Sequence, residues 1–212
     1  MAAISLQLEG TALTLEALAP LARGRDCRLV VRDAVYQGLE PSRAMVDRCL
    51  TEGKPVYGIS TGFGKLKSVA IDPADLAQLQ RNLVLSHSVG VGAPLAEHEV
   101  RIAQVLRLNS LLRGVSGIRV SLARDLVELF NRGFVPEVPG QGSVGASGDL
   151  APLSHMVAAY MGFGFASVAG VRMPARDALS AIDLPPMELS AKEGLALING
   201  TEVMKAIAVC NV

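Results

Sequence analysis

Apolar residues recur at helical spacing along most of this chain, and the pattern predicts a mainly α-helical protein. Asp72-Pro73 offers a cap and a first-turn proline for one helix. Two later stretches end in Gly114 and Gly133, and glycine commonly follows the last turn of a helix. We expect helices over residues 32–39, 41–51, 73–87, 96–114, 118–133 and 191–212. The last of these is apolar on most faces, so neighbouring elements must bury it.

Patterns typical of strands are few. RLVV near residue 28 and ASVAGVRM near residue 166 both predict short, hairpin-like strands. There is no internal repeat and no low-complexity tract, so residues 1–212 are expected to form a single domain with long buried helices. The apolar pattern is still running at Val212 without a terminating glycine or proline. We therefore expect either a chain that has been cut short or one whose core is completed by another polypeptide.

Composition narrows the class of protein. Twenty basic residues balance twenty acidic ones, which gives no electrostatic reason to expect nucleic acid or an anionic membrane surface as a partner. Cys27, Cys49 and Cys210 form no CxxC pair, and an odd number of widely spaced cysteines favours a reducing compartment. The N-terminus lacks the features of a signal peptide, and no apolar stretch reaches the ~20 residues of a spanning helix. We expect a cytoplasmic protein.

Residues 140–149, GQGSVGASGD, contain the glycine spacing of a dinucleotide-binding loop. That motif requires a preceding central strand, which Pro136 and Pro139 disfavour, and an acidic residue about 20 positions on, which is absent. A flexible linker is also disfavoured, because the loop runs directly into an apolar helix that Asp149 can cap and whose first turn suits Pro152. The loop is therefore expected at a helix N-terminus, where unpaired N–H groups favour negative charge.

The tripeptide Ala146-Ser147-Gly148 within this loop has a chemistry of its own. Gly148 has an unhindered amide nitrogen and permissive torsions, so it can be pressed towards the carbonyl carbon of Ala146. Ring closure there and loss of the Ser147 hydroxyl would expel two waters. The product would be a strong electrophile made from backbone alone.

The sequence around this tripeptide resembles that of a known family. GSVGASGDLAPLSHM is similar to the signature of the aromatic amino-acid ammonia-lyases, which comprise histidine, phenylalanine and tyrosine ammonia-lyases and related aminomutases. Four other blocks look like family blocks in family order, so the resemblance covers essentially the whole chain: YGISTGFG (57–64), RNLVLSHSVGVG (81–92), RLNSLLRGVSGIR (107–119) and EGLALING (193–200). It implies the long-helix bundle of the ammonia-lyase (fumarase/aspartase-like) type, with a small irregular N-terminal region carrying active-site loops. The chain corresponds to the N-terminal part, without the C-terminal helical part.

The resemblance implies a prosthetic group and catalytic residues. Ala146, Ser147 and Gly148 map onto the tripeptide that forms 4-methylidene-imidazol-5-one (MIO), and Asp149 onto the aspartate associated with its formation. Tyr57 maps onto the tyrosine that removes the β-proton of the substrate; a packing or hinge role is the alternative for a tyrosine beside glycines.

Substrate-binding roles follow in the same way. The pair Ser86-His87 looks like the histidine ammonia-lyase pattern, in which His87 orients an imidazole; a satisfied histidine at a helix end is the alternative. Asn199 resembles the asparagine that hydrogen-bonds the prosthetic group or the adduct, and the cost of burying an amide in an apolar helix supports a site role. His98 and His155 have no motif support. The histidines and cysteines lack metal-ligand spacing, so no metal is expected. No nucleotide is expected either, because the glycine loop lacks the context of a dinucleotide-binding motif.

The implied activity is the non-oxidative elimination of ammonia from an aromatic L-amino acid, most simply L-histidine to trans-urocanate. Family active sites are shared between subunits of a homotetramer, so the expected partners are an amino-acid substrate and further copies of the chain. Glu202 stands where many histidine lyases carry an uncharged residue, which keeps tyrosine or phenylalanine lyase and 2,3-aminomutase activity open. An inactive helical fragment with an uncyclised Ala-Ser-Gly loop is the other alternative. Arg107 and Asn109 receive no specific role.

Overall fold

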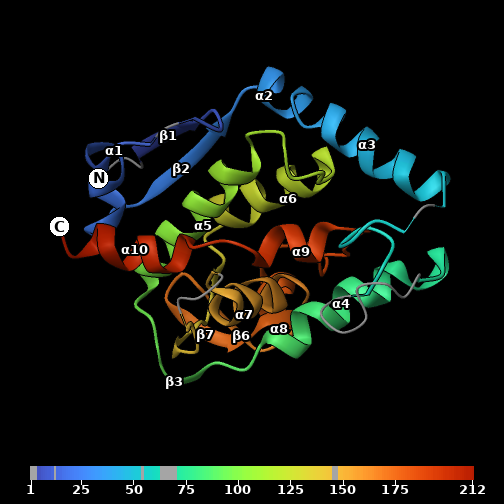
Figure 1. Cartoon of the computed structure of the whole chain (residues 1–212). Coiled ribbons are helices and arrows are strands. Elements are labelled where there is room, and N and C mark those ends of the chain that lie inside the picture. The colour runs from blue at the N-terminus through green and yellow to red at the C-terminus, as the bar shows by residue number, and fades with distance from the viewer. Residues whose placement is uncertain (1–3, 12, 54, 63–70, 145–147) are drawn as a thin grey trace.

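Helices dominate the computed structural model, which describes residues 4–11, 13–53, 55–62, 71–144 and 148–212 (Figure 1). The helices are α1 (Leu15–Ala22), α2 (Asp33–Gln37), α3 (Glu40–Thr51), the 3-10 turn η2 (Pro73–Asp75), α4 (Leu76–His87), α5 (Glu97–Leu111), α6 (Val120–Asn131), α7 (Leu150–Tyr160), α8 (Ala175–Ala181), α9 (Glu193–Ile198) and α10 (Glu202–Cys210). The mainly α prediction is confirmed. In the described part of the chain, no helix is both long and apolar enough to cross a membrane.

In the described residues, short strands between the helices pair into three small sheets. β1 (Ile4–Leu8) pairs in parallel with β2 (Cys27–Val31), while β3 (Val91–Pro94) and β5 (Pro139–Gln141) pair antiparallel. β4 (Val135–Pro136), β6 (Phe165–Val168) and β7 (Val171–Pro174) form the third sheet. The hairpin predicted near residue 166 is confirmed by the antiparallel pair of β6 and β7. The strand predicted near residue 28 is confirmed as β2, but it is not part of a hairpin, because β2 pairs in parallel with β1 across α1. The proline-rich approach to the glycine loop supplies only the short strands β4 and β5, so it contains no central strand of the kind a dinucleotide-binding loop follows.

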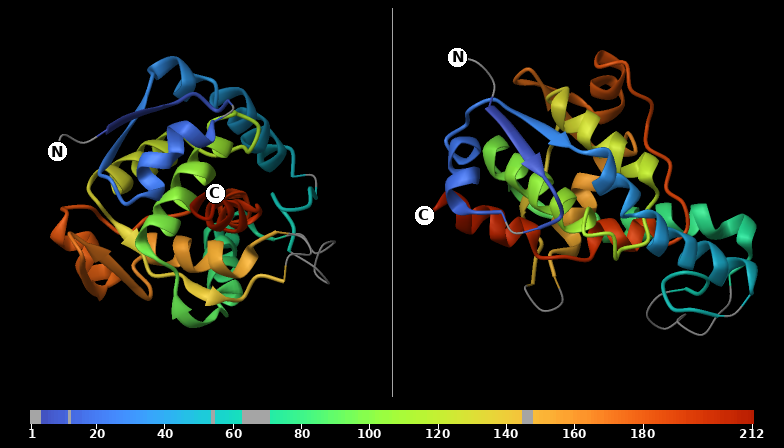
Figure 2. Two further views of the ribbon diagram at one scale, coloured as in Figure 1. Left: turned by 90° about the vertical axis from the view of Figure 1, so that its left-hand side faces the viewer. Right: turned by 90° about the horizontal axis from the view of Figure 1, so that it is seen from above.

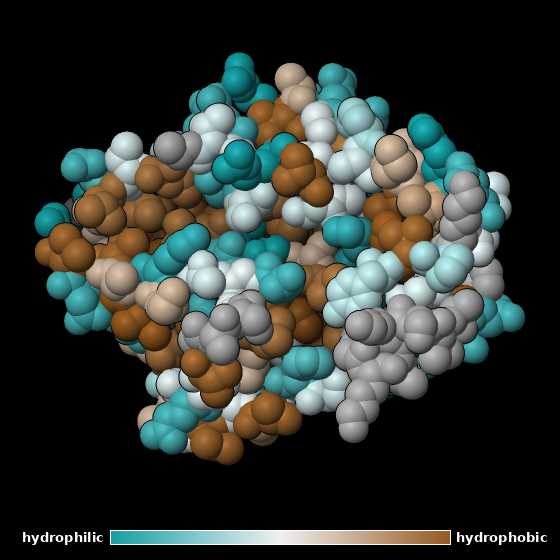
Figure 3. All heavy atoms as spheres, in the orientation of Figure 1, coloured by the Kyte–Doolittle hydropathy of each residue, from teal (hydrophilic) through white to brown (hydrophobic). Residues whose placement is uncertain are grey.

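The core lies where α5, α7, α9 and α10 meet. Figure 2 shows α10 between α5 and α7 in the view along its axis, and α9 also packs against α4 and α7. Ile102 and Leu111 of α5 and Leu153 of α7 are completely buried there. Apolar side chains also reach the surface: brown residues gather over the region of α1 and α10 in Figure 3, where Leu15 and Met204 are about half exposed. α7, α9 and α10, the segments that carry the candidate site, therefore pack into one shared core.

Several helix boundaries agree with local patterns in the sequence. The 73–87 prediction is confirmed as η2 followed by α4, with the Asp72 carboxylate accepting the Ala74 N–H at 2.9 Å. The helix predicted over 118–133 is α6, and Gly133 follows it with a φ of +74°. The helix predicted over 96–114 ends earlier, at Leu111. Gly114 then adopts a φ of +78° with its backbone against the carbonyl of Gly38, so a tertiary contact sets this turn.

The continuous helix predicted over 191–212 is wrong. The segment forms two helices, α9 and α10, separated by Asn199, Gly200 and Thr201. Asn199 leaves the helical region at φ −91° and ψ 91°, and a Cβ on Gly200 would collide with the side chains of Arg107 and Glu202. The apolar pattern runs through both helices because both are packed against neighbours, so periodicity alone could not reveal the break.

A buried carboxylate fixes the start of α9. Glu193 is fully buried, and its carboxylate oxygens accept hydrogen bonds from the backbone and guanidinium of Arg119 and from the Ser190 N–H, all between 2.7 and 2.9 Å. On the opposite side, the Gln80 side chain accepts the Gly194 N–H at 3.0 Å, which ties α9 to α4. Because α9 is only six residues long, these contacts rather than its own turns hold it in place.

Candidate active site

Gly148, the last residue of the predicted tripeptide, is described by the structure, whereas Ala146 and Ser147 lie outside the described residues. Its φ is +120°, a conformation that residues with side chains rarely adopt. A Cβ built on Gly148 would lie 2.6 Å from the carbonyl oxygen of Gly200, well inside van der Waals contact. Two glycine backbones therefore approach each other here, and the approach places Gly148 against the break between α9 and α10.

Asp149 is almost completely buried, and its backbone and side chain connect both sides of this approach. Its N–H donates to the Gly200 carbonyl at 2.6 Å. One carboxylate oxygen accepts the Ser143 hydroxyl at 2.8 Å, and the other accepts the backbone N–H of Met204 at 2.8 Å. We predicted Asp149 as a cap of the following helix, but its side chain makes no capping bond in α7. It caps the first turn of α10 instead, where negative charge is favoured.

An ion pair lies beneath Gly200. Arg107 of α5 and Glu202 of α10 are both more than nine-tenths buried, with Nη1 of the arginine 2.9 Å from Oε1 of the glutamate. Arg107 also donates to the carbonyl of Ala196 in α9. Neither residue was predicted to have a role in the site, although Gly200 within an apolar stretch was a local indication of a close backbone approach.

His87 is the last residue of α4 and is half-buried. Its Nδ1 lies 2.8 Å from the carbonyl oxygen of Leu83 and 3.2 Å from the Ser86 hydroxyl. Because a carbonyl oxygen can only accept, this contact requires a proton on Nδ1 and leaves Nε2 of a neutral ring as an acceptor. The helix-end contact that we gave as the alternative is therefore present, and it also orients the ring.

Tyr57 lies in a hydrogen-bonded turn. The N–H groups of Ile59 and Ser60 donate to the Val56 carbonyl, and the Ser60 hydroxyl accepts the Val56 N–H at 2.9 Å. Gly58 has a φ of +76°, which lets the turn close. The Tyr57 side chain is 59% exposed, so the chain presents its phenol at the surface.

Asn199 is the C-cap residue of α9 and precedes Gly200. Its side chain is exposed, so the expectation of a costly buried amide is wrong for this chain. The physical reason is the helix break: the residue stands at the end of a turn and not on the inner face of a continuous helix. Its position next to Gly200 nevertheless places its backbone at the approach of Gly148.

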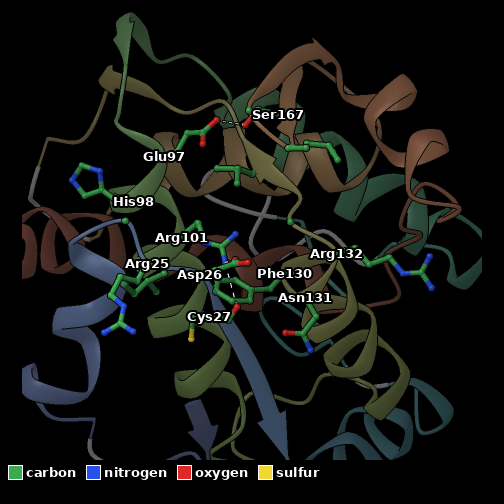
Figure 4. Close-up of a pocket in the computed structure, with 17 residues that line it drawn as sticks. Arg25, Asp26, Cys27, Glu97, His98, Arg101, Phe130, Asn131, Arg132 and Ser167 are labelled. Atoms are coloured by element: carbon green, nitrogen blue, oxygen red, sulfur yellow. Dashed lines mark hydrogen bonds and ion pairs between the residues drawn. The ribbon is translucent and has the colours of Figure 1, made fainter. Parts of the chain in front are cut away.

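Two cavities differ in whether predicted site residues line them. One of about 310 Å³ is bordered by Asp149, Ser143, Met204 and Ile207, so it opens beside the glycine loop. Another of about 610 Å³ contains none of the predicted site residues (Figure 4). There the guanidinium of Arg101 stacks on the Phe130 ring, with 4.4 Å from Cζ to the ring centroid. Among the described site residues, Asp149 is the one that borders the smaller cavity.

The remaining histidines support the fold. His155 of α7 accepts the N–H of Gly90 at its Nε2, at 2.9 Å, and burial lowers the pKa of its ring. This bond joins the segment after α4 to α7. His98 of α5 borders the larger cavity. Within the described part of the chain, no group of three or more histidine, cysteine or acidic side chains is arranged to hold a metal ion.

The helical core and the glycine loop packed against the α9–α10 break define the class of this protein. The chain matches the aromatic amino acid lyase family over residues 13–212, and it belongs to that family. Among curated relatives, it is 46% identical over 205 residues to the histidine ammonia-lyase of Caldanaerobacter subterraneus subsp. tengcongensis, covering 97% of this chain and 40% of that protein. A histidine ammonia-lyase of Streptococcus pyogenes serotype M49 is 46% identical over 203 residues, 95% of this chain and 39% of that protein. The chain thus spans about 40% of the length of the curated relatives it matches.

Solved structures agree with this assignment. The histidine ammonia-lyase of Trypanosoma cruzi superposes with a TM-score of 0.89 at 36% identity, covering 97% of this chain and 39% of that one. The phenylalanine aminomutase of Pantoea agglomerans gives 0.89 at 31% identity, covering 99% and 40%. An ergothionase from Treponema denticola gives 0.91 at 31% identity, covering 97% and 41%. One backbone arrangement is thus shared by proteins with different names.

Proposed function

We propose that this chain is the MIO-bearing, N-terminal part of an ammonia-lyase that converts L-histidine to trans-urocanate and ammonia. The observation that carries the proposal is the approach of Gly148 to Gly200, because it holds the third residue of an Ala-Ser-Gly tripeptide in a conformation open only to glycine. The identity of 46% to histidine ammonia-lyases supports the choice of substrate.

The described residues fit the prosthetic group that the family implies. Gly148 has no room for a side chain, and Asp149 ties the loop to Gly200 and to the first turn of α10. Ala146, Ser147 and Gly148 would form the group, and Asp149 would support its formation. Once formed, MIO would supply an electrophilic carbon that makes the substrate amine a better leaving group. Neither a metal nor a nucleotide belongs to the proposal.

His87 provides the chemical basis for selecting an imidazole. With the proton on Nδ1 directed at the Leu83 carbonyl, Nε2 can accept a hydrogen bond from an imidazole N–H of the substrate. A phenyl ring offers no such donor, and a site built around a polar partner rejects an analogue that lacks it. L-Histidine is therefore the proposed substrate, with L-tyrosine, L-phenylalanine and 2,3-aminomutase activity as the alternatives within the family.

Tyr57 is proposed as the base that removes the β-proton, and Asn199 as a hydrogen-bonding partner of the prosthetic group or the substrate. Both side chains are exposed in the single chain. Exposure suits a site that other polypeptide completes, because a base works best where water is excluded. We propose a homotetramer with shared sites, built on the long-helix bundle of the fumarase/aspartase-like type, in which residues 1–212 form the N-terminal unit. A cytoplasmic location is part of the same proposal.

The test is an assay of ammonia and urocanate release from L-histidine. It should be made on the 212-residue chain and on a longer form of the protein that contains residues beyond 212, with L-tyrosine and L-phenylalanine as competing substrates. The longer form should release urocanate, and Ser147→Ala should abolish that release. A longer form that releases cinnamate or a β-amino acid in preference would replace L-histidine with one of the family alternatives. Release undiminished in Ser147→Ala would refute the proposed mechanism.

A further inference from the structure

We propose that the buried Arg107–Glu202 pair is a positioning device for cyclisation of the tripeptide, acting through Gly200 on Gly148. The inference rests on the proposed function and adds two residues to it. Arg107 comes from α5 and Glu202 from the first turn of α10, so the pair joins two elements that meet under the loop.

Contacts connect the ion pair, through Gly200, to Gly148, the last residue of the tripeptide. A Cβ on Gly200 would overlap both the Glu202 carboxylate and the Arg107 guanidinium, so the Gly200 backbone rests directly on the pair. The Gly200 carbonyl in turn receives the Asp149 N–H at 2.6 Å and limits the space at Gly148. Moving the pair therefore moves the carbonyl that sets the position of the Gly148 backbone.

Stability alone does not account for this pair. Within the described residues, Oε2 of Glu202 and Nε of Arg107 are buried without a hydrogen-bond partner. A buried ion pair with unsatisfied atoms is often no more stabilising than well-packed apolar side chains of similar size. The Arg119–Glu193 pair differs, because its carboxylate receives four hydrogen bonds and borders neither Gly148 nor Gly200. The incompletely bonded pair is the one that lies under the loop.

Cyclisation depends on placement because ring closure joins two backbone atoms of the tripeptide. The Gly148 nitrogen bonds to the carbonyl carbon of Ala146, and that carbon loses its oxygen as water with the two amide protons of Ser147 and Gly148. Ser147 then loses its hydroxyl and its α-proton as a second water, leaving a carbon–carbon double bond. No oxidant or second reactant is consumed. The remaining requirement is that the Gly148 nitrogen be held close to its target carbon.

The experiment follows intact mass over time after cell-free synthesis of the 212-residue chain. Wild type should lose the mass of two waters. The apolar double variant Arg107→Met/Glu202→Leu should keep the wild-type urea midpoint but lose the waters about a hundredfold more slowly, as when reacting atoms are displaced by about 1 Å. Restoring a polar pair, with Glu202→Gln opposite the native Arg107, should recover most of the rate, because glutamine keeps the length and the acceptor.

Glu193→Gln is the matched control, since it perturbs a buried ion pair remote from the loop. It should lower the urea midpoint and leave the rate of water loss unchanged. Three results would overturn the inference: a folded double variant that cyclises at the wild-type rate, a double variant that does not fold, or a Glu193→Gln chain whose cyclisation slows together with its stability. If the wild-type sequence loses no water either as the 212-residue chain or in the longer form, the proposed function fails and this inference fails with it. Slow cyclisation confined to the double variant, with wild type cyclising, supports both.

Discussion

Replacing Asp149 by alanine tests the link between the glycine loop and α10. The carboxylate is almost fully buried and accepts two hydrogen bonds, from the Ser143 hydroxyl and the Met204 N–H, each at 2.8 Å. The N-cap residue of α10, Thr201, makes no side-chain capping bond of its own. Removal of the carboxylate therefore leaves a first-turn N–H of α10 without this acceptor.

The magnitude follows from these two bonds. A hydrogen bond to a charged group contributes about 1.5–3 kcal/mol, so the pair contributes about 3–6 kcal/mol before the cost of burying the carboxylate is subtracted. That cost offsets part of the gain, and we expect Asp149→Ala to lower the free energy of unfolding by about 2–4 kcal/mol. Asp149→Asn keeps one acceptor and should cost about 1 kcal/mol.

Urea unfolding followed by far-ultraviolet circular dichroism measures the effect. With a slope of about 2 kcal/mol per molar urea, a loss of 3 kcal/mol lowers the midpoint by about 1.5 M. Asp177→Ala is the control, because Asp177 is an exposed aspartate in the first turn of α8, and it should change stability by less than about 0.5 kcal/mol. Equal midpoints for Asp149→Ala and Asp177→Ala would refute the reasoning.

Three further results are expected. Glu193→Ala should lower the free energy of unfolding by about 2–4 kcal/mol in the same assay, because it removes the acceptor of the Arg119 and Ser190 N–H groups, whereas the Arg119 guanidinium is 39% exposed and can be hydrated; an unchanged midpoint would contradict this. Burial lowers the pKa of His155, so the folded chain binds fewer protons than the unfolded chain as pH falls. The contribution of His155 to the free energy of unfolding is therefore full above its ordinary pKa of 6.5 and is lost as pH falls through the lowered pKa. Urea midpoints between pH 7 and 5 should decline less steeply for His155→Gln, whose amide oxygen can still accept the Gly90 N–H; parallel declines would exclude His155 as the cause. Tyr57→Phe in the longer form should lower kcat for L-histidine by about 10²–10⁴-fold, as expected for loss of a general base, while intact mass still shows two waters lost; an unchanged kcat would remove Tyr57 from the mechanism.

Features of the fold that depend on local sequence were predictable. α4 and α6 combine apolar periodicity with an end marked by Asp72 or Gly133, and both were predicted within a few residues. The hairpin of β6 and β7 was predictable for the same reason. Each of these elements is determined by neighbours in the chain, so the residue pattern contains most of the information.

Features that depend on tertiary contacts were not predictable. The break between α9 and α10 arises because Gly200 rests on the Arg107–Glu202 pair, and Arg107 is 95 positions from Glu202 in the sequence. Asp149 is the N-cap residue of α7, as predicted, but its carboxylate bonds to the first turn of α10, which it reaches because α10 packs beside α7.

The candidate site shows the same division. Motifs predicted Tyr57, His87, Gly148 and Asn199 as site residues by resemblance, and their roles stay predictions. They could not show that Asn199 is exposed in this chain or that the His87 ring is oriented by the Leu83 carbonyl. Exposure and orientation are set by helix ends and by segments distant in sequence.

Ala146, Ser147 and Gly148 are proposed to form the prosthetic group, and the intact mass of the purified 212-residue chain shows whether they have done so. The mass should lie below the sequence value by two waters, and Ser147→Ala should not lose the water that the serine hydroxyl supplies. A wild-type mass equal to that of the unmodified 212 residues would refute formation of the group in this chain.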